Sequence, residues 1–220
     1  MKVKNYIYLT LCACLFSCMQ DEQNGDNVAV DTNSVVGDSA VKTQVAIVQN
    51  PKSVSEIKQA FAIINDRLMH GLLDSISYTY DCSGERNGTV TYYSDNGKLA
   101  VIKHSYNEYS HFSAIDQYFV NEGKLYFTFL DSTVWSFEPG HAAEGATKDD
   151  ITEQRLYLNE EKPLLCLEKK YTRRSQSSDN PNPDRIESKE VKCKSLEPVL
   201  KDYNRLLAFK DASSRDCLAK

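Results

Sequence analysis

The sequence predicts an α+β fold in which a curved antiparallel β-meander packs against two helices. Apolar residues at helical spacing occur near both ends of the folded part, at residues 57–72 and 196–207. Between these segments, apolar and polar residues alternate and are interrupted by turn-forming residues, which is typical of strands with one buried face. We therefore expect about seven to nine strands, with the N-terminal and C-terminal helices packed on one face of the sheet.

The first helix is expected to begin after Pro51, where Ser53 and Glu56 have the spacing of a capping box. Its apolar stripe continues as far as Leu72, and Gly71 and Asp74 mark its end. A second helix is expected after Ser195, which would cap it. The stripe of this closing helix consists of Leu196, Val199, Leu200, Tyr203, Leu206 and Leu207.

The clearest hairpin signal is Asn96-Gly97, because both residues accept the positive φ angles of a tight turn. A strand break is expected at Asp131-Ser132, and a polar insert is expected at residues 139–150. The loop at residues 175–184 is expected to be mobile, with a further strand within residues 185–192. The other expected strands are residues 75–82, 89–93, 99–104, 114–120, 124–130, 133–137, 152–158 and 164–171.

The N-terminus has the order of an export signal. Lys2 and Lys4 precede an apolar run at residues 6–16, and the small residue Ser17 precedes Cys18. A run of about 11 residues extends roughly 16 Å as a helix, which is shorter than a membrane span requires. A cleaved signal is therefore favoured over a transmembrane anchor.

Leu15-Phe16-Ser17-Cys18 resembles the lipobox of bacterial lipoproteins. The resemblance implies that the Cys18 sulfur receives diacylglycerol, that the signal is removed, and that the new amino terminus is acylated. Leu11-Cys12-Ala13-Cys14 also fits the pattern, but cleavage there would shorten the apolar core too far. The acidic pair Asp21-Glu22 resembles the surface-export signal of lipoproteins in some gut-dwelling Gram-negative bacteria. An outer-membrane, lipid-anchored protein exposed on the cell surface is the resulting expectation.

Composition divides the chain into three parts. Residues 1–17 form the signal peptide, residues 18–50 form the lipidated cysteine with an acidic, disordered tether, and residues 51–220 form a single α+β domain. The formal net charge is −5, which argues against nucleic acid as a partner. It also argues against electrostatic binding to anionic lipid, so the acyl chains on Cys18 would provide the membrane attachment.

Four cysteines follow Cys18, namely Cys82, Cys166, Cys193 and Cys217. An even number of cysteines outside the cytoplasm favours disulfides, and the spacing does not match a zinc site. Three pairings are possible. A bridge between Cys193 and Cys217 is feasible but taut, because a helix separates them, so the sequence leaves the pairing open.

The sequence contains no hydrolase, zinc-protease or nucleotide-binding motif, and we expect neither a cofactor nor an enzyme. The best metal ligands are His104, Glu108 and His111, which form only a weak candidate site. Thirteen tyrosines instead suggest an aromatic binding face on the sheet, although cross-strand packing would also account for them. The candidate residues of that face are Tyr92, Tyr93, Tyr106, Tyr109, Tyr118, Tyr126 and Tyr157.

These features favour a non-catalytic binding or accessory module that recognises a glycan, a peptide or an envelope protein. One alternative is a carrier of an apolar ligand such as a lipid, similar in fold to the half-barrel carriers that sort bacterial lipoproteins. That alternative predicts an apolar cavity between the sheet and the helices. A metal-dependent enzyme is the third possibility.

Overall fold

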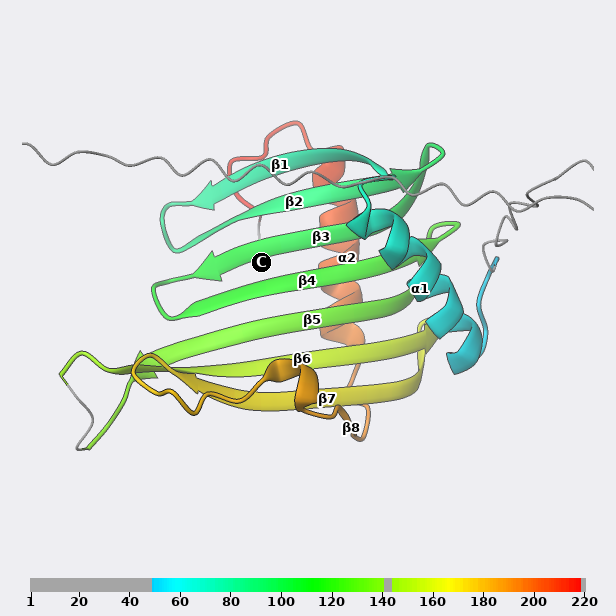
Figure 1. Ribbon diagram of the computed structural model, residues 1–220. Coiled ribbons are helices and arrows are strands. Elements are labelled where there is room, and N and C mark those ends of the chain that lie inside the picture. Colours follow the sequence, from blue (N-terminus) through cyan, green and yellow to red (C-terminus); the bar gives the residue numbers. More distant parts are fainter. Residues whose placement is uncertain (1–48, 141–143, 219–220) are drawn as a thin grey trace, which may run out of the picture. The chain divides into compact units, whose positions relative to one another are not determined.

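The computed structural model describes residues 49–140 and 144–218. Eight strands form one antiparallel sheet in which each strand pairs with the next in chain order, from β1 to β8 (Figure 1). The predicted α+β meander with two helices is therefore confirmed. Among the described residues, no helix is both long enough and apolar enough to span a bilayer.

The strands are β1 (Asp74–Cys82), β2 (Arg86–Asp95), β3 (Lys98–Glu108), β4 (Phe112–Asn121), β5 (Lys124–Phe137), β6 (Thr147–Asn159), β7 (Lys162–Arg174) and β8 (Lys189–Glu190). The helices are α1 (Val54–Met69), the short 3-10 helix η1 (Pro183–Arg185) and α2 (Glu197–Lys210).

The capping box predicted for α1 is confirmed. The Ser53 hydroxyl accepts a hydrogen bond from the Glu56 amide at 3.3 Å, and the Glu56 carboxylate accepts one from the Ser53 amide at 3.1 Å. These bonds satisfy amides that have no partner within the helix. The hydrogen bond that the Glu56 carboxylate accepts from the Lys52 amide, followed by the one from the Ser53 amide, lowers the pKa of Glu56.

Tight turns and bulges shape one end of the sheet. Asn96 and Gly97 join β2 to β3 with φ angles of 50° and 77°, which confirms the predicted turn, and Glu122-Gly123 repeats it between β4 and β5. The register shifts just before each of these turns, and it shifts again before the β6–β7 turn. Such bulges bend strands and increase their twist, so this end of the sheet curves.

The two helices lie on opposite faces of the sheet, and the prediction that they share one face is wrong. Helix α1 packs in the same apolar cluster as Val101 and Phe119, whereas α2 packs in the cluster that contains Ile102 and Tyr118. Val101 and Ile102 are neighbours on β3, and Tyr118 and Phe119 are neighbours on β4. Because neighbouring residues of a strand point to opposite faces, the two clusters lie on opposite sides of the sheet. The central strands carry consecutive apolar residues because both of their faces are covered there.

Several predicted boundaries also change. Strand β5 runs without a break from Lys124 to Phe137, so the interruption expected at Asp131-Ser132 is absent. The side chains of Asp131 and Ser132 point to opposite faces of this continuous strand. Polar residues are tolerated at these two positions because both side chains are only partly buried. The further strand expected within residues 185–192 is reduced to the two residues of β8.

At the start of α2, Leu196 takes the N-cap position without a capping side chain. Ser195 lies one residue earlier, where its hydroxyl accepts a hydrogen bond from the Glu197 amide at 3.3 Å. The predicted cap is therefore displaced by one residue.

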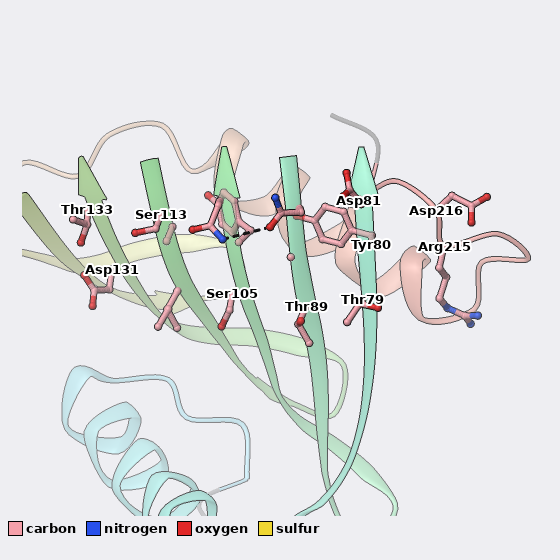
Figure 2. Close-up of a pocket in the computed structure, with 16 residues that line it drawn as sticks. Thr79, Tyr80, Asp81, Thr89, Ser105, Ser113, Asp131, Thr133, Arg215 and Asp216 are labelled. Carbon is pink, nitrogen blue, oxygen red and sulfur yellow. Dashed lines mark hydrogen bonds between the residues drawn. The ribbon is translucent and has the colours of Figure 1, made fainter. Parts of the chain in front are cut away.

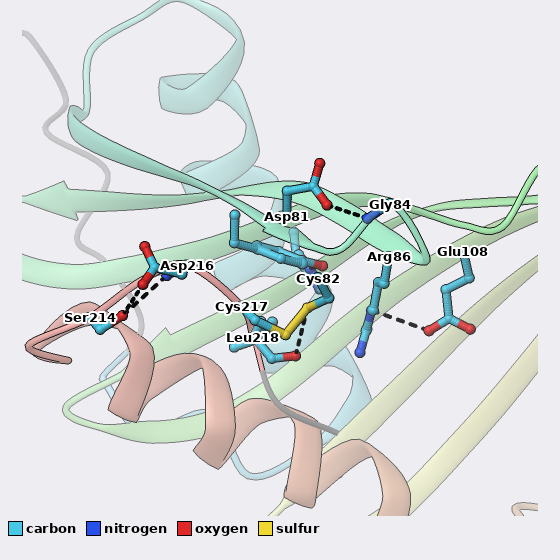
Figure 3. Close-up of a disulfide and its surroundings, with 11 residues drawn as sticks. Asp81, Cys82, Gly84, Arg86, Glu108, Ser214, Asp216, Cys217 and Leu218 are labelled. Carbon is cyan, nitrogen blue, oxygen red and sulfur yellow. Dashed lines mark hydrogen bonds and ion pairs between the residues drawn. A yellow bond between two sulfur atoms is a disulfide. The ribbon is translucent and has the colours of Figure 1, made fainter.

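Two disulfides close the domain, as the even number of cysteines predicted. Cys82 at the end of β1 bonds to Cys217 after α2 (Figure 3), and Cys166 on β7 bonds to Cys193. The alternative bridge between Cys193 and Cys217 is not formed. The Asp81 amide also donates a hydrogen bond of 2.9 Å to the Asp216 carbonyl, so the chain after α2 is fixed against the edge strand β1.

Candidate ligand-binding groove

The α1 face of the sheet carries an open groove over β1 to β5, with a volume of about 1040 Å³ (Figure 2). We call it the polar groove. Its side chains form two rows across the paired strands, and Arg215 and Asp216 border it at the β1 edge. The first row is Thr79, Thr89, Ser105, Ile115 and Asp131, and the second row is Asp81, Asn87, Asn107, Ser113 and Thr133.

The groove is open to solvent because the two segments that pack on this face, α1 and residues 175–188, cover other parts of the sheet. Helix α1 packs over the turn end of the face, where Val101, Phe119 and Phe127 are buried beneath it. The segment from residue 175 to 188 lies over β6 and β7, where the Lys169 ammonium donates to the Pro183 carbonyl at 3.3 Å (Figure 1). The polar groove lies on the part of this face that neither α1 nor residues 175–188 cover.

Short polar side chains dominate the polar groove, and its charge is acidic. Asp81, Asp131 and Asp216 contribute carboxylates against the single guanidinium of Arg215. Burial, followed by the neighbouring Glu153 carboxylate, raises the pKa of Asp131. The groove therefore offers many donors and acceptors that would bind an uncharged polar ligand or one with a modest positive charge.

Arg215 is held in place by the C-terminus of α2. Its guanidinium donates to the carbonyls of Phe209 at 3.2 Å and Lys210 at 2.6 Å. The guanidinium carbon also lies 4.0 Å from the centre of the Tyr78 ring, within the range of a cation–π interaction. The β1 border of the groove is thus preorganised.

A second polar cluster lies on the opposite face, between the sheet and α2. The buried His104 ring accepts or donates a 2.9 Å hydrogen bond with the Tyr80 hydroxyl and stacks on Tyr106 at 4.3 Å. The Arg86 guanidinium also lies over the Tyr106 ring, 4.5 Å from its centre. It pairs with the Glu108 carboxylate at 3.2 Å (Figure 3).

Burial controls ionisation in this cluster. It raises the pKa of Asp116 to about 7, and the Asp202 carboxylate adds to the rise, while a hydrogen bond from Tyr106 opposes it. Burial lowers the pKa of His104 to about 3, with a further contribution from the positive charge of Arg86. Shifts of this size occur at functional sites but also in structural networks. With only 2% of His104 and 8% of Asp116 exposed, we interpret the cluster as part of the core.

The structure does not bring the predicted tyrosines together on one binding face. Neighbours such as Tyr92 and Tyr93 point to opposite faces because strand side chains alternate. Tyr92, Tyr106 and Tyr118 belong to the α2 side, Tyr93, Tyr126 and Tyr157 belong to the α1 side, and Tyr109 lies exposed in the β3–β4 turn. Tyr92, Tyr118, Tyr126 and Tyr157 are buried, so packing accounts for most of the set.

The weak metal candidate is not assembled either. His104 is buried against Tyr80, Glu108 pairs with Arg86, and His111 lies 3.3 Å from the Trp135 carbonyl. Among the described residues, no group of three histidine, cysteine or acidic side chains converges as metal ligands would.

Sequence reasoning missed the polar groove, although one signal for it was present. The polar positions of β1 are Ser75, Ser77, Thr79 and Asp81, and they alternate with the apolar positions. Such alternation predicts an uncovered face for one strand. It does not show which residues of β3, β4 and β5 continue the same rows, because that depends on the register of pairing.

No protein-family model, curated protein or solved structure matches the chain. The predicted lipidation residue Cys18 lies outside the described residues, as do the predicted signal peptide and nearly all of the predicted tether. The function is therefore argued from the chemistry of the residues.

Proposed function

We propose that the protein is a lipid-anchored envelope protein whose sheet domain is a non-catalytic binding module, with the polar groove as its ligand site. The observation that carries the proposal is the groove itself: about 1040 Å³ of open space on a sheet face that a helix leaves uncovered. Most of its lining side chains carry hydroxyls or amides, which can orient a polar ligand by donating and accepting hydrogen bonds.

The anchor in this proposal rests on the lipobox-like residues up to Cys18 and on the acidic charge of the chain. The apolar-carrier alternative receives no comparable support. Between the sheet and α2, the side chains of Tyr92, Tyr118 and Leu206 are almost completely buried. On the other face, Ile57 of α1 and Phe119 beneath that helix are equally buried. Side chains therefore fill the spaces in which that alternative would place a lipid.

The proposal is tested by blocking the groove. The purified protein and the Ser105→Arg variant would be applied to a glycan array and a peptide array, with Asn204→Arg as the control. Ser105 lies in the middle of the groove, whereas Asn204 is an exposed residue of α2 on the opposite face. We expect binding that is lost in Ser105→Arg and retained in Asn204→Arg, with unchanged circular dichroism. Absence of binding on both arrays, or equal binding by both variants, contradicts the proposal.

A further inference from the structure

Aromatic side chains lie next to the polar groove at the end of β5. Trp135 and Phe137 follow the groove residue Thr133 by two and four positions along the strand, so their side chains project from the same face. The two rings meet edge to face at 5.5 Å, and the His111 ring lies 4.3 Å from Trp135. We call Trp135, Phe137 and His111 the aromatic platform.

The aromatic platform is held by backbone contacts with the β3–β4 turn. The Trp135 amide donates to the His111 carbonyl at 3.0 Å, and its indole N–H donates to the Ser110 carbonyl. The Trp135 ring is therefore fixed before any ligand arrives. A fixed ring loses little conformational entropy on binding.

Exposure of the platform has no evident structural role. Phe137 is 66% exposed, although burial of a phenylalanine side chain is favourable. His111 is also exposed, and Trp135 between them is half-buried. Contiguous exposed aromatic surface of this kind marks interaction sites on folded proteins.

We propose that the aromatic platform and the polar groove form one glycan-binding site, an inference that rests on the function proposed above. Sugar rings carry apolar C–H faces that stack on aromatic rings, and their hydroxyls both donate and accept hydrogen bonds. The groove supplies matching hydroxyls and amides, such as those of Ser105, Thr89 and Asn107.

An extended peptide fits this surface less well. Peptide recognition on sheets uses separate pockets for alternate side chains. The two rows of the groove floor consist instead of similar short polar residues, apart from Ile115, and Ala114 is the other aliphatic side chain in the lining. Such a floor suits a ligand whose hydroxyl groups repeat along its length. From β1 to β5 the groove crosses four strand spacings, roughly 19 Å, which is the length of a short oligosaccharide.

The test uses the fact that Trp135 is the single tryptophan of the chain, so its fluorescence reports on the platform alone. The purified protein would run through native gels containing starch, mixed-linkage β-glucan, xylan, galactomannan or mucin. We expect at least one of these glycans to retard it and to change its tryptophan emission. Phe137→Ala and Trp135→Phe should each weaken the retardation more than tenfold. Val134→Ala, on the opposite face of β5, should leave it unchanged.

Three results would overturn the assignment. The first is that none of the five glycans retards the protein, and the second is that Phe137→Ala is retarded as strongly as the unmodified chain. Peptide-array binding that Ser105→Arg abolishes, without any glycan signal, would also reject a glycan ligand. That last result would leave the proposed binding module standing, so the two failures are distinguishable.

Discussion

Replacement of Asp116 by asparagine should change how stability depends on pH. The folded pKa of Asp116, about 7, lies above its ordinary value of 3.8 because the carboxyl is buried. The unfolded chain therefore releases this proton first, and ionisation favours unfolding. The contribution of Asp116 to stability is complete below about pH 3.8 and is lost as the pH rises to about 7, a total of about 4 kcal/mol.

His104 produces the opposite trend. Its folded pKa of about 3 lies below the ordinary 6.5, so its contribution is complete above pH 6.5 and is lost as the pH falls toward 3. Between pH 3.8 and 6.5 the fall in stability due to Asp116 and the rise due to His104 nearly cancel, so together the two groups make stability almost independent of pH. Removing one group would uncover the slope of the other.

The measurement is urea unfolding of the unmodified chain and of Asp116→Asn, monitored by circular dichroism at pH 4.5, 6.0 and 7.5. Asparagine keeps an acceptor for Tyr106 but cannot ionise. Relative to the unmodified chain, the variant should gain about 3 kcal/mol between pH 4.5 and 7.5. His104→Gln is the matched variant of opposite sign, and it should gain about 3 kcal/mol from pH 7.5 down to 4.5. A constant free-energy difference between Asp116→Asn and the unmodified chain over this range would refute the reasoning.

Three further predictions concern stability. Replacing Cys82 and Cys217 together by serine releases a loop with a sequence separation of 135, and should lower the free energy of unfolding by about 2–5 kcal/mol in urea; a change below 1 kcal/mol would contradict it. Gly88→Ala places a methyl group 2.6 Å from the Ser105 carbonyl oxygen, and should lower the free energy of unfolding in urea by roughly 1–3 kcal/mol; an unchanged free energy of unfolding would contradict it. Glu160 and Glu161 in the β6–β7 turn have φ angles of 47° and 62°, so changing them to Asn-Gly should raise the free energy of unfolding by about 1 kcal/mol. A lower thermal midpoint of the variant in calorimetry would count against this reasoning.

Local patterns predicted the elements well because their causes are local. The Ser53–Glu56 capping box and the Asn96-Gly97 turn depend on residues a few positions apart, and both appear as expected. The closing helix was also located, although its cap moved by one residue. In each case the interaction that decides the structure is contained in a short window of sequence.

Properties that depend on the pairing of distant segments were predicted less well. The disulfide partners Cys82 and Cys217 meet because the chain after α2 returns to β1, a path that spacing alone does not specify. The placement of the helices was missed for another reason. Val101-Ile102 and Tyr118-Phe119 are consecutive apolar pairs, which indicate a strand covered on both faces, and each pair divides between the two cores.

The same strands serve both faces, which connects the core to the proposed site. On β3, Ser105 points into the polar groove while its neighbours His104 and Tyr106 belong to the polar cluster beneath α2. Gly88 on β2 lies against this point, with the Tyr80 hydroxyl, the Tyr106 Cβ and the Ser105 carbonyl all close to where its own Cβ would be. The buried cluster and the groove rows therefore share the backbone of β1, β2 and β3. A substitution that loosens the cluster should therefore reduce ligand affinity in the groove without removing any group that touches the ligand.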